Sequence, residues 1–263
     1  MKFTKMQGLG NDYLYVYGPP PANVAALSVH LSDRHFGPGS DGMIFIAPSN
    51  RADFRMWIFN ADGSEAKMCG NGIRCVGKYV YDKGYTDKTF LTIETLSGIK
   101  MLHLHLWGGK VKSVTVGMGM CAAGDDLELS AGGEKVACTP VDVGNPHAVI
   151  FVEDAETAPV TELGPIIEKH SAFPGGVNVE FVQVLEANRL RMRVWERGSG
   201  ITMACGTGAC ASAAAAVRKG FCTVGEPVTV VLDGGELKVT VESDGTVMMS
   251  GPAEFVYEGE VSL

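Results

Sequence analysis

The sequence has no long apolar segment and no cluster of basic residues. None of its apolar runs reaches the roughly 18 residues that a membrane-spanning helix needs, and the N-terminal stretch MKFTKMQGLGND lacks the apolar core of a secretory signal. The chain has 30 acidic and 22 basic residues, and its net charge of −8 argues against a nucleic-acid-binding surface. We therefore expect a cytoplasmic protein with no membrane or nucleic-acid partner.

The cysteines form no complete metal-site pattern and no C-x-x-C redox motif. There are seven of them, an odd number that argues against a framework of disulfides. Cys69 and Cys75 are separated by five residues and Cys205 and Cys210 by four. Neither pair is C-x-x-C, and only the second pair reaches the upper limit of C-x₂₋₄-C. We predict no metal site, although spacing alone leaves metal binding or disulfide exchange open. Five cysteines are predicted to be structural: Cys75, Cys121, Cys138, Cys210 and Cys222.

The chain contains an internal duplication. An offset of 136 residues places FRMWIFNADGSEAKMCGNG, which contains Cys69, over LRMRVWERGSGITMACGTG, which contains Cys205. An offset of 134 residues places GNDYLYVYG over GNPHAVIFV. Several such matches in the same order indicate two homologous halves. We predict an N-terminal half at residues 1–113, a C-terminal half at 114–251, and a tail at 252–263 that returns to the N-terminal half.

Each half has the pattern of short strands around one helix. Runs such as DYLYVYG, MIFIAP and DFRMWIFN are rich in β-branched and aromatic residues and are bounded by turn residues. A helix follows Cys69 and an alanine-rich helix follows Cys205, and glycines end them at Gly84 and Gly220. A further helix is predicted within ANVAALSVHLSDRH. We therefore predict an α/β (α+β) fold of two pseudo-symmetric halves with an active-site cleft between them.

A cysteine stands directly before Gly-x-Gly at the start of both predicted helices. The Asn-Gly dipeptide of the first motif is typical of a hairpin turn, but helical periodicity follows it. GPGSDG at 37–42 matches a dinucleotide-binding fingerprint, yet it leads into a strand rather than a helix. We favour an anion site, because the N–H groups and the dipole of a helix N-terminus attract a carboxylate. The glycines let that backbone approach a ligand closely.

Two cysteines at two such helix starts supply an acid and a base. A helix N-terminus can lower a thiol pKa from ~8.5 to about 3.5–7.5, whereas two thiols that share a site oppose each other's ionisation. One thiolate removes the α-proton of a bound amino acid, and one thiol returns a proton to the opposite face. The sequence thus predicts a racemase or epimerase with Cys69 and Cys205 as its catalytic residues.

With these motifs, the sequence resembles the diaminopimelate epimerase family of cofactor-independent amino-acid racemases over essentially the whole chain. The resemblance implies a barrel-like, strand-rich sheet around a central helix in each half. It also implies interconversion of L,L- and meso-diaminopimelate for lysine and peptidoglycan synthesis, without pyridoxal phosphate or another cofactor. Cys69 is then the base for the L,L form and Cys205 the base for the meso form. The implied partner is this small substrate, and a homodimer is left open.

The resemblance also assigns the residues around the substrate. It implies that His147 helps the thiols and that Glu196 and Arg197 hold the substrate, mainly at its distal amino-acid end. Glu196 is also predicted to belong to the catalytic residues. A guanidinium suits a distal carboxylate, and a carboxylate suits a distal ammonium group. The implied substrate-binding residues are Asn11, Asn60, Gly70, Asn71, Asn145, Asn178, Glu196, Arg197, Gly206 and Thr207.

Several alternatives stay open at this point. The same scaffold could serve a racemase of another amino acid, such as histidine, or an amino-acid-binding protein without activity. Taken singly, the asparagines are typical of turns. Two positions depart from the family pattern. Gly42 stands where some members carry a substrate-contacting glutamine, and Ile201 replaces an acidic residue.

Overall fold

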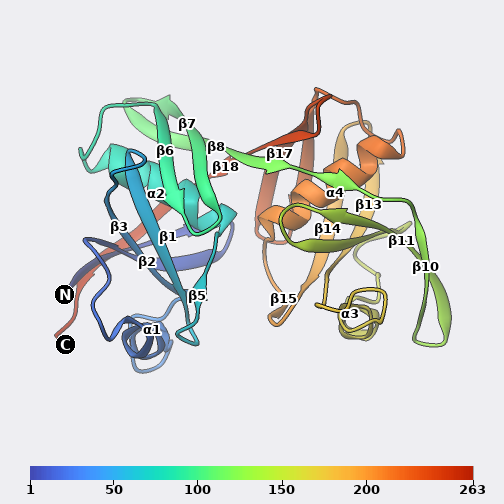
Figure 1. The fold of residues 1–263 in the computed structure, drawn as a ribbon, viewed down its shortest axis with the longest axis horizontal. Coiled ribbons are helices and arrows are strands. Elements are labelled where there is room, and N and C mark those ends of the chain that lie inside the picture. Colours follow the sequence, from blue (N-terminus) through green and yellow to red (C-terminus); the bar gives the residue numbers. More distant parts are fainter. Residues whose placement is uncertain (263) are drawn as a thin grey trace. The chain divides into compact units, whose positions relative to one another are not determined.

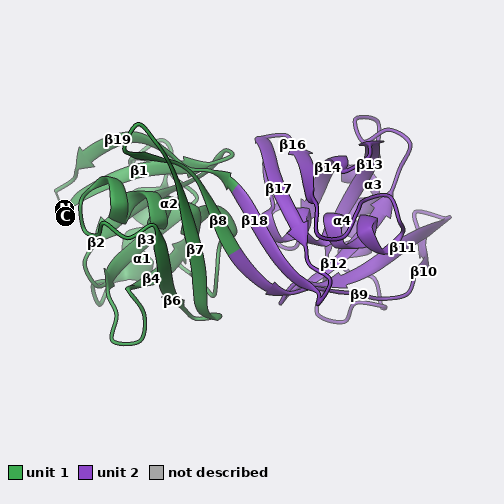
Figure 2. Cartoon of the chain, turned by 90° about the horizontal axis from the view of Figure 1, so that it is seen from above, with its two compact units in different colours: residues 1–116, 251–263 green, residues 117–250 purple. Residues whose placement is uncertain are grey.

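The computed structural model describes residues 1–262, which form two compact units (Figure 2). Unit 1 contains Met1–Val116 and Gly251–Leu263, and unit 2 contains Gly117–Ser250. Strand β8 (Lys110–Met120) leads from unit 1 into unit 2, and β18 (Thr246–Pro252) leads back. Strands and four helices make up the described chain, which confirms the predicted mixed fold of two strand-rich halves.

In unit 1 the sheet has the neighbour order β19, β1, β2, β3, β4, β6, β7 and β8. A two-residue strand, β5, pairs with β4. The bounds are β1 Lys2–Gly8, β2 Asn11–Tyr17, β3 Gly42–Pro48, β4 Phe54–Asn60, β5 Glu65–Ala66, β6 Phe90–Thr95, β7 Gly98–Trp107 and β19 Glu254–Glu260.

In unit 2 the order is β10, β11, β12, β13, β14, β16, β17 and β18. Short strands β9 and β15 pair with β11 and β14. The bounds are β9 Ala122–Ala123, β10 Leu127–Ala131, β11 Glu134–Asp142, β12 Pro146–Phe151, β13 Asn178–Glu186, β14 Arg189–Glu196, β15 Gly200–Ile201, β16 Pro227–Leu232 and β17 Gly235–Val241.

The two units repeat one topology. In unit 1, β2 runs parallel to β3 and β4 runs parallel to β6, while the other neighbours from β1 to β8 are antiparallel. In unit 2, β12 with β13 and β14 with β16 are the parallel pairs at the same places. The sequence match is therefore also a match of strand order and direction.

A buried helix carries the cysteine motif in each unit. Helix α2 (Gly70–Asp82) contacts β1, β2 and β7, and α4 (Gly206–Arg218) contacts strands from β9 to β17 (Figure 1). Both helices are buried along most of their length, and small alanine side chains on α4 let the surrounding strands approach closely. Gly84 and Gly220 follow with positive φ angles of 77° and 76°, so the predicted helix ends are confirmed.

The outer face of each sheet is covered by a shorter helix. Helix α1 (Val24–Ser32) falls within the range predicted for it and packs with Leu14, Phe45 and Phe59. Helix α3 (Val160–Glu168) packs on Val179 and Phe181 and was not predicted. Successive strand residues point to opposite faces of a sheet. The strand residues that alternate with those packed against α1 and α3 therefore point to the buried helices α2 and α4.

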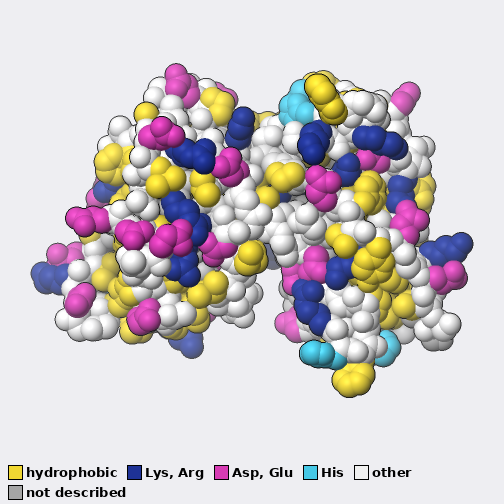
Figure 3. Space-filling model, turned by 180° about the vertical axis from the view of Figure 1, so that it is seen from behind, with side chains coloured by type: hydrophobic (Ala, Val, Ile, Leu, Met, Phe, Trp, Pro, Cys, Tyr) yellow, Lys and Arg dark blue, Asp and Glu magenta, His cyan; other side chains and the backbone are white. Residues whose placement is uncertain are grey.

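Charges of both signs are interspersed on the surface. On the face shown in Figure 3, basic and acidic side chains lie next to one another on both units. Arg191, for example, pairs with Glu156 and Asp233. Within residues 1–262, no helix is long and apolar enough to cross a membrane.

Two buried thiols predict a loss of stability at alkaline pH. Burial raises the pKa of Cys75 to about 11 and that of Cys138 to about 11, from an ordinary 9.0. Between pH 9 and 11 the unfolded thiol has lost its proton and the folded thiol keeps it. Stability is therefore full below pH 9 and falls as pH rises, by about 1.4 kcal/mol per pH unit for each thiol.

Urea unfolding in reductant between pH 8 and 11 measures this slope. Cys75→Ala should reduce the decrease in the free energy of unfolding of unit 1 by about 1.4 kcal/mol per pH unit, which corresponds to one proton. Cys138→Ala should have the same effect on unit 2. The control is Val76→Ala, which removes buried apolar volume next to Cys75 without removing a titrating group. It should lower stability equally at every pH. An unchanged slope in both cysteine variants would contradict the prediction.

Candidate functional site

Cys69 is the N-cap of helix α2. Its backbone is extended, with φ −139° and ψ 115°, and its sulfur accepts a hydrogen bond from the Gly72 amide at 3.3 Å. The thiol also donates to Asn11 Oδ1 at 3.3 Å. Gly70 and Asn71 form the first turn of the helix and are buried. The structure therefore places the predicted thiol and the predicted anion-binding backbone at one helix start.

Two asparagines of unit 1 have different surroundings. Asn11 donates through Nδ2 to Asp41 at 2.7 Å, so its oxygen stays directed to Cys69. Asn60 donates through Nδ2 to Ser64 Oγ at 3.0 Å, in the turn between β4 and β5. The contact between Asn11 and Cys69 joins two predicted site residues directly. The side-chain contact of Asn60, in contrast, is with Ser64 and not with another predicted site residue.

Cys205 occupies the same position in unit 2. It is the N-cap of α4, with φ −112° and ψ 110°, and its sulfur accepts from the Gly208 amide at 3.4 Å. The hydroxyl of Thr207 lies 3.5 Å from this sulfur. Only 5% of Cys205 is exposed, whereas Cys69 is partly exposed. The two thiols thus share a backbone geometry but differ in solvent contact.

A buried histidine and a glutamate lie beside this second thiol. His147 contacts Asn145 Oδ1 through Nε2 at 3.2 Å and Glu180 Oε1 through Nδ1 at 2.7 Å. Asn145 in turn donates to Thr207 at 3.5 Å. Asn145, His147 and Thr207 were predicted as site residues, whereas Glu180 was not. In the sequence, Glu180 is the one acidic residue within the apolar run VNVEFVQV. This pattern indicates an unusual residue but not the histidine that it contacts.

Burial and negative charge raise the pKa of Cys205. Removal from water is the largest cause, and the carboxylates of Glu196 and Glu180 add to it, although hydrogen bonds from Thr207 and Gly208 act in the opposite direction. The sequence predicted that a helix N-terminus can lower a thiol pKa and that only one of the two thiols ionises readily. At Cys205, desolvation and two nearby carboxylates outweigh the helix end, so the pKa is raised rather than lowered.

Glu196 is also buried, and burial raises its pKa. Hydrogen bonds from Thr202 and Cys205 oppose this shift by stabilising the charged form. Glu196 and Cys205 therefore act on each other: the thiol favours the charged carboxylate, and the carboxylate raises the pKa of the thiol. The role of Glu196 toward substrate and thiols stays a prediction.

Arg197 and Asn178 are joined through the backbone. Asn178 Oδ1 accepts from the Arg197 amide at 2.9 Å, and its Nδ2 donates to the Pro146 carbonyl at 3.2 Å. The guanidinium of Arg197 donates to the carbonyls of Gly175 at 2.8 Å and Gly176 at 3.5 Å. Because both bonds use Nη1, the remaining donors of this planar group can take part in binding a carboxylate.

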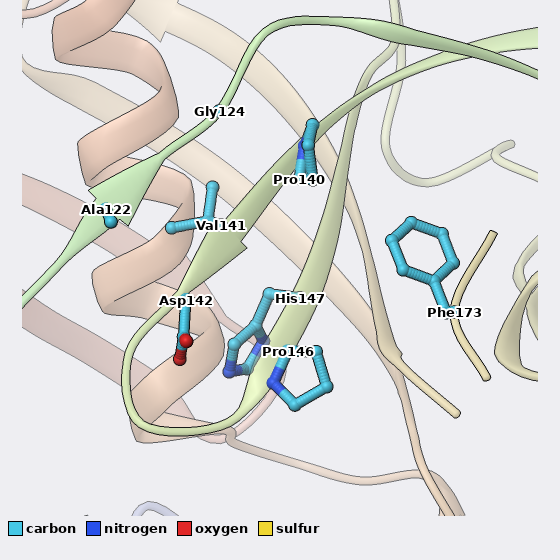
Figure 4. A pocket seen from close by; sticks show the side chains of 8 residues that line it. All are labelled: Ala122, Gly124, Pro140, Val141, Asp142, Pro146, His147 and Phe173. Atoms are coloured by element: carbon cyan, nitrogen blue, oxygen red, sulfur yellow. The ribbon is translucent and has the colours of Figure 1, made fainter. Parts of the chain in front are cut away.

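A cavity of about 280 Å³ lies against β9, β11 and β12 in unit 2 (Figure 4). His147 is among its lining residues, yet its side chain has no exposed surface. The cavity therefore borders the buried histidine, and Cys205 is not among its lining residues. The lining is mostly apolar: Ala122, Gly124, Pro140, Val141, Asp142, Pro146, His147 and Phe173.

The two departures from the family pattern have clear surroundings. Gly42 has a φ of +154°, and a Cβ there would lie 2.1 Å from the Phe59 carbonyl oxygen. This backbone therefore leaves no room for a side chain at position 42. Ile201 is 43% exposed at the end of β15. Within residues 1–262, no group of three or more His, Cys, Asp or Glu side chains is placed to hold a metal ion.

Comparison with known proteins shows the family. The model of the diaminopimelate epimerase family matches residues 3–122 and 139–256. Diaminopimelate epimerase of Methanococcus maripaludis strain S2 is 49% identical over an alignment of 279 positions that covers 100% of both chains. That of Phocaeicola vulgatus is 50% identical, with 100% of this chain and 99% of the relative covered. The chain belongs to the diaminopimelate epimerase family.

Solved structures of more distant proteins share the fold of this family member. A PhzF-family phenazine biosynthesis protein of Bacillus anthracis has a TM-score of 0.80 at 16% identity, with 100% of this chain and 99% of that chain covered. A hydroxyproline epimerase of Agrobacterium vitis has a TM-score of 0.72 at 17% identity, with 100% and 92% covered. At such low identity these likenesses concern the fold alone.

Proposed function

We propose that the protein interconverts L,L- and meso-diaminopimelate by moving one proton at Cα between two thiols. Identity near 50% to diaminopimelate epimerases over the whole chain supports this substrate. The names of these relatives favour it over histidine. The observation that carries the mechanism is the repeated N-cap cysteine, at Cys69 and Cys205, in two units of one topology.

The two thiols are proposed to act on opposite faces of one Cα in the substrate-bound state. When L,L-diaminopimelate is the substrate, Cys69 as thiolate takes the α-proton, and Cys205 as thiol gives a proton to the other face. The raised pKa of Cys205 supports its role as the proton donor in this direction. In the reverse direction the same two groups exchange roles, so no net proton is gained or lost.

The helix starts are proposed to hold the reacting carboxylate. Removal of the α-proton spreads negative charge onto that carboxylate, and donors aimed at it lower the barrier. The first-turn residues Gly70, Asn71, Gly206 and Thr207 supply the backbone N–H groups. An added Cβ on Gly208 would lie 3.3 Å from Cys205 Sγ. A glycine at this position therefore leaves space for the carboxylate beside the thiol.

The distal amino-acid end of the substrate is proposed to bind at Arg197 and the asparagines. Arg197 suits the distal carboxylate because its guanidinium is always charged and planar. Asn178 fixes the Arg197 backbone, and Asn145 lies between Thr207 and His147. Asn11 and Asn60 from unit 1 complete the proposed substrate-binding set.

Proton NMR in D₂O tests this function. The purified protein, with reductant and without added pyridoxal phosphate, should exchange the α-proton of L,L-diaminopimelate for deuterium and form the meso isomer. Exchange of histidine or another amino acid without exchange of diaminopimelate would keep the two-thiol mechanism and overturn the substrate. Exchange of none of them would overturn the enzyme and favour an amino-acid-binding protein.

A further inference from the structure

Glu180 and His147 form a buried pair within unit 2. Both side chains have no exposed surface, and Glu180 Oε1 lies 2.7 Å from His147 Nδ1. Within the described chain, the second oxygen of Glu180 has no hydrogen-bond partner. Burying a carboxylate with one oxygen unpaired costs free energy. A residue that carries such a cost calls for an explanation beyond packing.

Strand alternation places Glu180 on the helix side of the sheet. Its neighbours on β13, Val179 and Phe181, pack under α3 on the outer face. Glu180 therefore points to α4, where an added Cβ on Gly208 would lie 2.8 Å from its Oε1. The carboxylate lies directly against the first turn of the helix that begins at Cys205.

The topological repeat shows what the fold alone requires at this place. In unit 1, Ile44 points to α2, and its Cδ1 would lie 2.7 Å from a Cβ added to Gly72. Ile44 thus stands where Glu180 stands, by sequence offset and by contact with the glycine of the cysteine motif. An aliphatic side chain fills the position in one unit, so packing does not require a carboxylate in the other.

The partner of Glu180 also differs between the units. The repeat places Tyr13 of β2 where unit 2 has His147 of β12. Tyr13 has hydrogen bonds to the side chains of Asn11 and Cys69. The position of the imidazole that contacts a carboxylate in unit 2 is thus taken in unit 1 by a phenol, and the position of that carboxylate by an aliphatic side chain.

Polar contacts continue from this pair to the thiol. Beyond the Glu180–His147 contact, His147 Nε2 lies 3.2 Å from Asn145 Oδ1. Asn145 Nδ2 lies 3.5 Å from Thr207 Oγ1, which lies 3.5 Å from Cys205 Sγ. The orientation of the imidazole therefore bears on groups that touch the sulfur.

We propose that Glu180 is a positioning residue for the reaction at Cys205, acting through His147. As a carboxylate it only accepts hydrogen bonds, so it keeps a proton on Nδ1 and fixes the ring plane. The other ring nitrogen, Nε2, is thereby directed to Asn145 Oδ1, an acceptor on the side of the thiol. This inference rests on the proposed function of Cys205 as a catalytic thiol.

The test replaces Glu180 with the residue that unit 1 carries. Glu180→Ile should fold, and kcat for L,L-diaminopimelate should fall about 10- to 100-fold, by analogy with residues that orient metal-binding histidines. KM should stay within about twofold, because no substrate contact is removed. In Glu180→Gln the amide oxygen can still accept a hydrogen bond from His147 Nδ1. The kcat of Glu180→Gln should therefore lie between those of the wild type and Glu180→Ile. If Glu180→Ile does not fold, Glu180→Gln carries the test.

Two further readouts separate positioning from a structural role. Nitrogen-15 NMR of the imidazoles, with His147 assigned by its loss in His147→Gln, should show a proton on Nδ1 in the wild type. Glu180→Ile should lose this signature. In the His147→Gln background, Glu180→Ile should cause no further loss of kcat. Wild-type kcat in Glu180→Ile, an unchanged Nδ1 proton, or equal losses in both backgrounds would overturn the proposal.

The proposed function fails by a different observation. A wild-type protein that exchanges no α-proton of diaminopimelate would overturn that function and, with it, the catalytic role of Glu180. The imidazole spectra need no substrate and would still show whether Glu180 sets the tautomer of His147.

Discussion

Cys69→Ala and Cys205→Ala should each lose more than about 1,000-fold in the rate of epimerisation, within the range that one proton-transferring group supplies. Inversion at Cα requires proton removal from one face and delivery to the other. A variant with one thiol lacks one of these steps. Both variants should remain folded, because alanine is compatible with the extended backbone at either N-cap and leaves the buried helix in place.

The two variants should also differ from each other in D₂O. With Cys69 alone, any residual exchange on L,L-diaminopimelate should proceed with retention, because the same thiol removes and returns the proton. With Cys205 alone, residual exchange should occur at the D-configured centre of the meso isomer. Cys222→Ala, which removes a buried thiol elsewhere in unit 2, is the control and should keep full activity. Epimerisation at an undiminished rate by either single-thiol variant would rule out the two-thiol mechanism.

Gly42→Ala should be strongly destabilising. Position 42 has a φ of +154°, and the added Cβ would lie 2.1 Å from the Phe59 carbonyl oxygen. That oxygen belongs to β4, where the neighbouring Asn60 is paired with Gly42 across the sheet. The neighbour is backbone within a ladder, so it cannot rotate away as a side chain would. The family glutamine at this position would meet the same obstacle.

Gly18→Ala is the matched control for this effect. Its φ of +140° is similar, but no atom lies within 4 Å of the added Cβ. Backbone strain alone should cost about 1–3 kcal/mol in both variants, and the clash should add about 1–3 kcal/mol in Gly42→Ala. Urea unfolding of unit 1 measures the difference. Equal free energies of unfolding for Gly42→Ala and Gly18→Ala would contradict the prediction, because they would show that the contact with the Phe59 carbonyl adds no loss of stability.

The sequence predicted the elements that repeat and missed one that is irregular. Apolar spacing, alanine content and terminal glycines were enough for α2 and α4. Helix α3 contains Pro165 directly after Gly164, and both residues disfavour helix interiors. An added Cβ on Gly164 would lie 2.6 Å from Trp195. Close packing of α3 against β14 therefore explains why a glycine stands at position 164, although glycine disfavours a helix.

The sequence predicted the candidate site as a set of residues but not its electrostatic environment. The motifs identified Cys205, Asn145 and His147, because each lies in a recognisable local pattern. The raised pKa of Cys205 comes first from burial and then from the charges of Glu196 and Glu180. Strand β13 brings Glu180 to α4 from a distant part of the sequence. Such a charge has no local signature, since a single acidic residue in a strand is most often found facing solvent.

Strand β19 has a consequence for how the protein is synthesised. It pairs with β1, so unit 1 contains both the first and the last strands described in the chain, while unit 2 is one continuous segment. On the ribosome, unit 2 is therefore complete before unit 1, although unit 1 begins first. Until residues 254–260 emerge, β1 lacks this neighbour and presents an open sheet edge. The nascent chain is thus most exposed to mispairing in the half that was made first.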